Sequence, residues 1–595
     1  MQMFCNLPGG FFFITLLRTL AWVTIFGVAG QAFMRATKTL SANEHYAPAV
    51  GMAIFILVSV IFGWTSGIRQ WNALPVTLII ICISVFLGKD WIILTKQLGF
   101  LLICAIPIAI VNLAVLGIFG DYNTGNDTFT YLVHGQWLQS HSFGEMPADI
   151  EHHPAFSQIT IYQRLGWRMG MSFLLGWVQA AGSMEWSYET YPVLATTALI
   201  AGALAIGGLS SRLSQSGTLF CGVWTVVAGI VAGGFNYGAV RGFLPQMGAL
   251  TLLTVLLGTL SGLEYGKTPG VRVLLLPVLI LGALGYAYSE IIPFVGLTLV
   301  IFFLLEAYRL RSCSPLVAAT ILMTGTLVAW NFEIARMAQA ICSQSKAVVG
   351  WPINWSSFEF FCHSCGILAA DGRWVFPNSL GILAGILAGA LLCTTLIKIR
   401  ERFPFIIYAG LLVVAFVYFR LAAANPWSIG YGQSWSQFKL ANWISPAVLV
   451  LLGIGMAGLF KTRRVLCVSV MALWVLSGAY GQIELASKSM PTICKELHRP
   501  YHPLKIYEEL LGNIHRVGNG TLYIPPHTFS VKRQQLGSYF LYQIPLEADW
   551  RKDDYFGGVY SFDNPSSDAR WQIVPGKGPN ASFLTVVRLP AATSK

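Results

Sequence analysis

The side chains best suited to chemistry gather between residues 120 and 155. This stretch holds four of the ten histidines and five of the 26 acidic residues of the 595-residue chain. From Asp127 onward, Phe129, Leu132 and Trp137 recur near a helical period, which predicts a short amphipathic helix over 127–139 lying on the membrane. Asp127 would be its N-cap or first-turn residue. An aspartate at a helix start is often only a cap, so its position alone leaves a structural and a catalytic role open.

A carboxylate at such a position could accept a proton from an attacking hydroxyl group. Partial desolvation at a membrane surface makes a carboxylate a better proton acceptor. By its position Asp127 could be such a base, and Asp121 and Glu290 are possible helpers. Glu290 lies between two apolar runs, where a carboxylate is costly unless a cavity solvates it.

Histidines in the same stretch are candidate substrate-binding residues: His134, His152 and His153. They could instead hold a divalent cation together with Asp127 or Asp121. Their irregular spacing is weak evidence for a metal site, so a metal cofactor remains an open alternative.

Cationic groups that could stabilise an anionic group lie further along the chain. Arg420 follows an apolar run, and Lys439 lies in a polar and aromatic segment, residues 430–443, that also contains Trp435. The aromatic side chains could stack on sugar rings. Equally, this segment could be an ordinary interfacial aromatic belt with a snorkelling lysine.

The composition shows which elements must position these residues. Hydrophobic residues make up 55% of the chain and charged residues 11%, whereas soluble proteins average about 25% charged. A soluble fold, a disordered chain and a small disulfide scaffold are excluded, and an all-α polytopic membrane protein remains. About 13–14 transmembrane helices are expected from the apolar runs, which lie near 17–34, 48–65, 73–88, 98–119, 191–209, 217–233, 243–261, 273–289, 291–305, 315–331, 377–397, 404–421, 444–460 and 465–482.

Charge divides the chain into a membrane part and a water-exposed part. Of the 64 charged residues, 23 fall in the last 112 positions, which places a boundary near residue 481. Lysines and arginines in short loops predict which loops are cytoplasmic. The opposite, extracytoplasmic side then carries the loops 120–190, 234–242, 332–376 and 422–443 and the tail.

Four regions follow from this pattern: N-terminal spans over 1–119, a first large outer loop with interfacial helices and the candidate site over 120–190, a helical core over 191–482, and a soluble extracytoplasmic domain over 483–595. The tail is expected to be mixed α/β, with a helix at 503–516 and β-rich runs at 522–524, 538–542, 559–562, 571–574 and 583–587. A bacterial inner membrane is the expected location.

At this point the sequence resembles the GT-C superfamily of polyprenyl-phosphate-dependent membrane glycosyltransferases, such as aminoarabinose transferases and protein O-mannosyltransferases. The resemblance lies in a long first outer loop with an Asp-x-x-x-Tyr helix, formed by Asp127 and Tyr131, followed by Leu138, Ser140 and the element 153–156. Many members have two adjacent acidic residues, whereas Thr128 follows Asp127 here. The three N-terminal spans would be an addition to the core.

The resemblance implies a sugar donor linked to polyprenyl phosphate, membrane lipids as surroundings and a glycan, lipid or protein acceptor, with Asp127 as base. A polysaccharide ligase or polymerase, or a transporter or flippase of lipid-linked sugars, are the alternatives. No repeat of the kind expected in a transporter and no nucleotide-binding motif is visible in the sequence, and the scattered basic residues do not predict nucleic-acid binding.

Overall fold

The computed structural model describes most of the helical part of the chain and parts of the tail. The described residues are 9–39, 44–87, 91–114, 116, 127–147, 153–165, 168–263, 265, 269–331, 333–346, 350–398, 403–488, 520–524, 538–542, 544–548, 569–575 and 584–589. Asp121 and His152 lie outside these ranges, as do the expected helix 503–516 and the expected strand 559–562.

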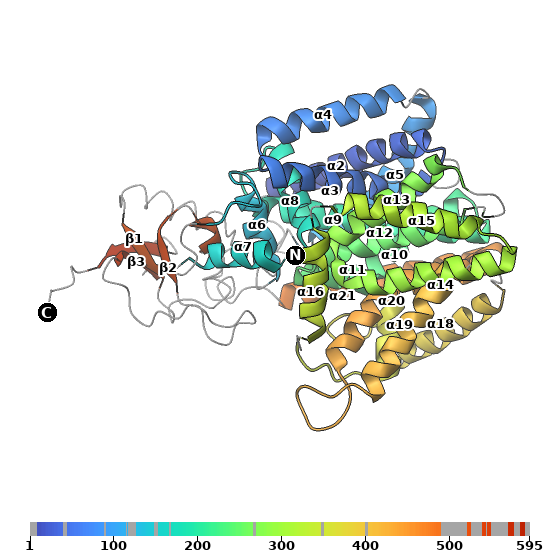
Figure 1. The fold of residues 1–595 in the computed structure, drawn as a ribbon. Helices are drawn as coiled ribbons and strands as arrows, with labels where there is room; N and C mark the ends of the chain where they lie inside the picture. Colours follow the sequence, from blue (N-terminus) through green and yellow to red (C-terminus); the bar gives the residue numbers. More distant parts are fainter. Residues whose placement is uncertain are drawn as a thin grey trace.

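The expected polytopic helical fold is confirmed. The described part of the chain has ten helices that are long and apolar enough to cross a membrane, or eleven if a bent pair forms one span. The long helices run roughly parallel in one bundle (Figure 1). They are α2 (Gly9–Ala36), α3 (Ala47–Thr65) with the preceding turn η2 (Glu44–Tyr46), α4 (Gln70–Leu87), α5 (Trp91–Leu113), α9 (Ser187–Ser214), α14 (Ile292–Leu310) with the preceding turn η4 (Ser289–Ile291), α18 (Asn378–Lys398), α19 (Phe403–Leu421), α20 (Ser434–Thr462) and α21 (Arg464–Lys488). The bent pair is α15 (Ser314–Ala329) and α16 (Ile334–Lys346).

Three of the fourteen apolar runs form helices of fewer than 18 residues, which are too short to count as candidate membrane spans. These are α10 (Thr218–Val231), α12 (Leu244–Leu260) and α13 (Val271–Ala287), with 14, 17 and 17 residues. At 1.5 Å per residue they are shorter than about 30 Å of hydrocarbon. Every residue of α12 is buried, so the apolar character of this helix reflects the protein interior rather than lipid contact.

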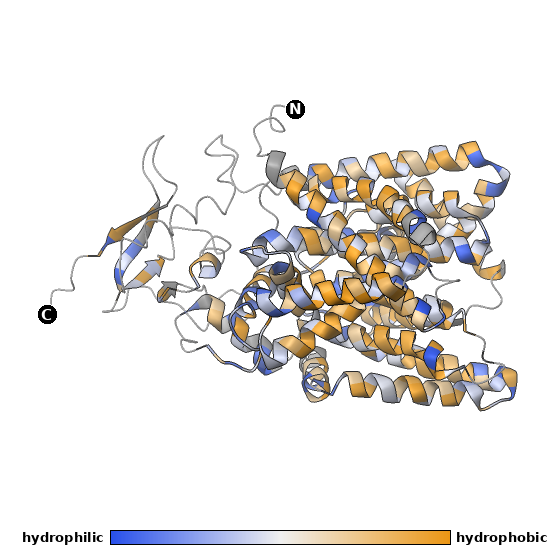
Figure 2. Ribbon diagram, turned by 90° about the horizontal axis from the view of Figure 1, so that it is seen from above, coloured by the Kyte–Doolittle hydropathy of each residue, from blue (hydrophilic) through white to orange (hydrophobic). Residues whose placement is uncertain are grey.

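The helices at the centre of the bundle are buried by other helices, and the helices at its periphery expose apolar side chains. In α9 all residues of its most apolar 18-residue stretch are buried. In the corresponding stretches of α4, α19 and α21, only 22% of the residues are buried. Helices that look apolar all round by sequence therefore divide into two classes. Many large apolar side chains of α4, α19 and α21 are exposed, and the ribbons of the bundle are mostly hydrophobic in colour (Figure 2), as expected where acyl chains replace water.

The tail contributes a small sheet of four strands in the order β2-β1-β3-β4. They are β1 (Thr521–Ile524), β2 (Leu546–Ala548), β3 (Ala569–Pro575) and β4 (Leu584–Arg588). β1 is parallel to β2 and β3, while β3 and β4 are antiparallel. The expected strands at 522–524, 571–574 and 583–587 are confirmed. The run 538–542 differs, because residues 538–540 are helical and their aromatic rings pack on the bundle instead of pairing in the sheet.

This aromatic turn attaches the tail to the end of the bundle that carries α6 (Asp127–Trp137) and α7 (Pro154–Leu165). The sheet lies beyond that end (Figure 1). Tyr539 and Phe540 contact the ring of Trp186. The Tyr539 hydroxyl accepts a hydrogen bond from the Tyr188 backbone N–H at 3.1 Å and donates to Gln136 Oε1 at 3.3 Å. Tail and helix α6 thus share a buried polar contact.

Replacing Tyr539 by Phe should destabilise this attachment. The change leaves the ring in place but removes the partner of the Tyr188 N–H, which costs about 1–3 kcal/mol when a buried group loses its partner. We expect a lower melting temperature of the purified protein in detergent. The exposed Tyr431 is the control, since Tyr431→Phe should leave the melting temperature unchanged. Equal melting temperatures for both variants would show that the contact contributes nothing to stability.

Candidate functional site

The expected helix at Asp127 exists as α6, and it is more enclosed than the sequence suggested. Residues 128–137 are all buried, under α7, α8 (Met169–Ala181) and α9. The interfacial helix of the expectation is therefore an inner layer of the protein at one end of the bundle. Asp127, in the first turn, keeps 22% of its side chain exposed, so the start of α6 is the part that solutes can reach.

Close backbone contact fixes the start of α6. Gly242 ends α11 (Gly233–Arg241) with φ of 84°, and a Cβ at this position would lie 1.5 Å from the Thr128 hydroxyl oxygen. Only glycine adopts this conformation readily and leaves this space. The loop between α11 and α12 (Leu244–Leu260) therefore packs directly against Thr128, the residue after Asp127.

Changing Gly242 to Ala should displace the first turn of α6. Strain of a positive φ costs on the order of 1–3 kcal/mol, and the clash with Thr128 adds to it. We expect a lower melting temperature together with a loss of any activity that depends on Asp127. Gly144→Ala is the control, since a Cβ at Gly144 meets nothing within 4 Å. A fully active, equally stable Gly242→Ala variant would contradict this account.

Arg168 occupies the N-cap of α8 in the left-handed conformation, with φ of 45°. A left-handed arginine is uncommon and often marks a functional site. Gly170 lets α8 approach helix α13, which comes later in the chain, because a Cβ at Gly170 would lie 2.7 Å from the Tyr286 carbonyl carbon. This close packing brings Arg168 next to the residues that follow α13.

The guanidinium of Arg168 joins three groups from two distant parts of the chain. Its Nη1 donates to Asp127 Oδ2 and to the Tyr131 hydroxyl, both at 3.3 Å. Its Nε donates to Glu290 Oε1 at 2.7 Å, and Nη2 also contacts that oxygen. Burial opposes the charge of Arg168, but the neighbouring carboxylates raise its pKa well above the ordinary value, so it stays a cation.

Glu290 receives two cations and a hydroxyl. Besides Arg168, it accepts from Lys439 Nζ at 3.0 Å and from the Tyr288 hydroxyl at 2.8 Å, both through Oε2. The Arg168 guanidinium also lies over the Tyr288 ring at 5.4 Å. Asp127, Arg168, Glu290 and Lys439 thus form one charged cluster with balanced formal charge, to which Tyr131 and Tyr288 contribute hydroxyl groups.

Exposure divides the charged cluster into an inner and an outer pair. The side chains of Glu290 and Arg168 are 7% and 10% exposed, whereas those of Lys439 and Asp127 are 21% and 22% exposed. The inner pair is engaged by several partners. Asp127 and Lys439 are therefore the more exposed carboxylate and the more exposed cation of the cluster.

The histidines of the candidate loop have other surroundings. His134 is fully buried against the rings of Phe143 and Phe173, and burial lowers its pKa to about 3, so it is neutral. His153 stacks on Phe156, and its Nδ1 accepts from the Ala155 N–H at 3.2 Å. Within the described residues, no group of three or more His, Cys, Asp or Glu side chains could hold a metal ion.

Arg420 and Trp435 lie near the first turns of α20 but contact different groups from Lys439. Arg420 Nη1 donates to the Trp355 carbonyl and to Gln437 Oε1, both at 3.2 Å. Trp435 packs with Trp351 and Phe438. Because Trp435 and Lys439 are four residues apart on one helix, they share a face, and the aromatic cluster adjoins the charged one.

The sequence reasoning missed Arg168 and Tyr288. Arg168 is the first residue of the apolar segment 168–182, and its position in a loop rich in acidic residues was the available signal. Tyr288 is two residues before Glu290, a spacing that carries no pattern of its own.

Similarity to known proteins is found among solved structures. No family model matches the chain, and no curated protein matches it. Among solved structures, it is similar to ArnT from Cupriavidus metallidurans in the apo state. The sequence identity is 12% and the TM-score 0.44, over 79% of this chain and 92% of that chain. A likeness of this size does not assign an activity, which has to be argued from the charged cluster.

Proposed function

We propose that this protein is an integral membrane glycosyltransferase that moves a sugar from a polyprenyl-phosphate donor to a hydroxyl group of an acceptor. The observation that carries the proposal is the charged cluster, which places a reachable carboxylate and a reachable cation around one buried Arg168–Glu290 pair. We place the reaction on the extracytoplasmic side of a bacterial inner membrane, at the end of the bundle that carries α6 and the tail sheet.

The chemistry assigns one role to each of the outer residues. Asp127 accepts the proton of the acceptor hydroxyl as its oxygen attacks the anomeric carbon. The bond from that carbon to the phosphate oxygen breaks, and the polyprenyl phosphate leaves with one more negative charge. Lys439 stabilises this charge, since preorganised cations act most strongly where charge develops.

The inner pair positions the outer one. Glu290 holds the Lys439 ammonium and the Arg168 guanidinium through different oxygens, and Arg168 in turn fixes Asp127 and Tyr131. Arg168 also keeps a positive charge beside the reacting groups. Glu290 has several donors already and is therefore less suited than Asp127 to take a proton from substrate.

The proposal predicts that the purified protein binds polyprenyl phosphate itself, the expected leaving group. Changing Lys439 to Ala should weaken this binding, because a hydrogen bond to a charged group contributes about 1.5–3 kcal/mol, or roughly 10- to 150-fold in affinity. Binding can be measured with the protein in nanodiscs. Unchanged affinity in Lys439→Ala would remove Lys439 from the site.

Arg420→Ala is the matched comparison. Arg420 was an equally good candidate by sequence, but its contacts here are with Trp355 and Gln437. A smaller loss of affinity than in Lys439→Ala is expected. A loss confined to Arg420→Ala would move the phosphate site to the aromatic cluster around Trp435 and would favour a different active centre, as in the ligase or polymerase alternative.

A further inference from the structure

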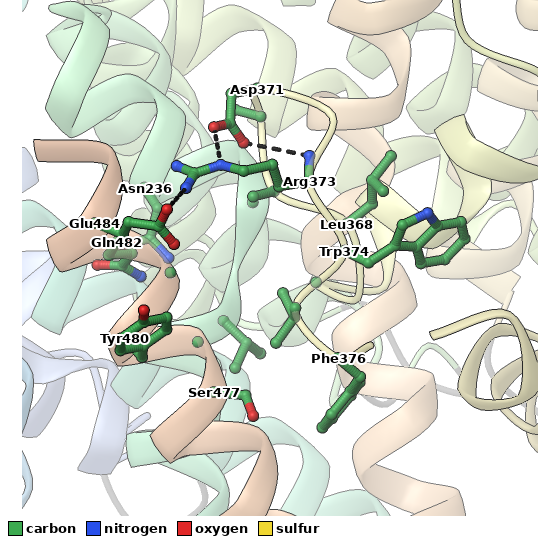
Figure 3. A pocket seen from close by; sticks show the side chains of 18 of the residues that line it. Asn236, Leu368, Asp371, Arg373, Trp374, Phe376, Ser477, Tyr480, Gln482 and Glu484 are labelled. Atoms are coloured by element: carbon green, nitrogen blue, oxygen red, sulfur yellow. Dashed lines mark hydrogen bonds and ion pairs between the residues drawn. The ribbon is translucent and has the colours of Figure 1, made fainter. Parts of the chain in front are cut away.

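A cavity lies apart from the residues of the charged cluster. It is bounded by the junction of α10 and α11, the segment 366–378 and the last turns of α21. Its volume is about 870 Å³. One side carries Asn236, Gln482 and Glu484, and the other carries Trp374 and Phe376 (Figure 3). None of the residues of the charged cluster lines this cavity.

Two polar atoms of the cavity, one on Asn236 and one on Arg373, have no hydrogen-bond partner among the residues that the structure describes. Asn236 uses its Nδ2 to donate to the Ile230 carbonyl at 2.7 Å, but its buried Oδ1 has no hydrogen-bond partner. Arg373 pairs with Asp371 and with Glu484, the latter at 3.0 Å, while its buried Nη2 has no hydrogen-bond partner. Buried polar atoms are rarely left unsatisfied. The cavity therefore offers one acceptor and one donor to a ligand.

The charges of the lining restrict the ligand further. Two carboxylates, Asp371 and Glu484, face a single guanidinium, Arg373, so the described lining has a formal charge of −1. A phosphate headgroup would be repelled. A hydroxyl group suits both unsatisfied atoms, because it can donate to Asn236 and accept from Arg373.

The cavity is also open toward the surroundings of the bundle. Leu476 and Tyr480 line it and are 69% and 70% exposed. Both belong to α21, a candidate span with apolar side chains on its outer face. Because α21 leads into the tail here, the polar lining lies near the helix end, where lipid headgroups are found, and the apolar side chains lie where acyl chains begin.

We propose that this cavity binds a membrane amphiphile with an uncharged, hydroxylated headgroup, that is, a neutral glycolipid. The headgroup hydroxyls contact Asn236 and Arg373, the rings of Trp374 and Phe376 cover its apolar faces, and the acyl chains leave past Leu476. This inference does not depend on the proposed transferase activity.

Native mass spectrometry of the full chain tests the proposal, with monoglucosyl diacylglycerol as the probe and phosphatidylglycerol as the anionic comparison. One molecule of the glucosyl lipid should be retained, about tenfold more tightly than phosphatidylglycerol. Ser477→Trp, which fills the cavity, should reduce retention about tenfold or more. Leu473→Trp, on the exposed face of the same helix, should not change it.

Arg373→Lys is the second variant, in case the tryptophan disturbs folding. This change keeps the positive charge beside Asp371 and Glu484 but removes the planar guanidinium and its several N–H donors. It should weaken retention of the glucosyl lipid about fivefold, as expected for the loss of one ordinary hydrogen bond. Equal retention of both lipids, or equal retention in Ser477→Trp, Arg373→Lys and the unaltered protein, would overturn the proposal. Loss of polyprenyl phosphate binding in Lys439→Ala with intact glucosyl lipid retention would show that the two sites are separate.

Discussion

Replacing Asp127 by Asn should lower the turnover of sugar transfer by roughly 10²–10⁴-fold, the contribution of a general base. The amide keeps the size of the side chain and an oxygen that can accept from Arg168 Nη1, and Asn caps a helix about as well as Asp. Expression and melting temperature should therefore stay close to those of the unaltered protein. Product formation can be scored in lipid extracts of cells that carry the variant.

Asp127→Ala separates the catalytic role from a capping role. A residue that only caps α6 predicts full activity with Asn and a stability loss of about 1 kcal/mol with Ala. Full activity of Asp127→Asn would refute the assignment of the base, and Asp121, outside the described residues, would be the next carboxylate to change. A transporter would also give this result, because transport does not require a proton acceptor for a bond-forming step.

The second large effect is expected at Arg168. Changing it to Gln leaves Asp127 and Glu290 with Lys439 as the one remaining cation of the cluster. Removing one partner of a buried ion pair costs about 3–5 kcal/mol, and loss of one charge-stabilising donor reduces turnover about 10²–10³-fold. Thermal unfolding and product formation should both change.

Two further variants distinguish assembly of the charged cluster from general damage. Arg168→Lys restores the charge but cannot reach Asp127, Tyr131 and Glu290 with one planar group, so stability should recover more than turnover. Arg164→Gln, at an exposed position of α7 four residues earlier, should change neither. If Arg168→Lys were as active as the unaltered protein, the three-way contact would have no role in the reaction.

Local patterns in the sequence were enough to find most residues of the charged cluster one by one. Asp127 and Tyr131 are one helical turn apart, and that spacing is readable because both lie on one helix. Glu290 and Lys439 each stood out as charges beside apolar segments. Their mutual contact spans 149 positions, and it depends on how η4 and α20 pack, which no local pattern encodes.

Other features could not be predicted because the same residue type satisfies several environments. An arginine at the end of a span, such as Arg420, can pair with a substrate phosphate or, as here, with a carbonyl and an amide oxygen. Apolar helices such as α12 and α19 look alike in composition, yet one is buried in protein and the other faces outward. The fold class was predictable from composition, whereas the assignment of helices to centre and periphery required the structure.

The amide of Gln136 has a practical consequence for dissecting this protein. Its Oε1 accepts hydrogen bonds from Gln179, from the Ser187 backbone and from Tyr539 of the tail, and it belongs to the same helix as Asp127. A membrane fragment that ends before Tyr539 would lose one of these donors at the helix that carries the base. The usual division of such a chain into a membrane half and a soluble half, each studied alone, would then alter the part under study, and an inactive fragment would not show that the tail itself takes part in the reaction.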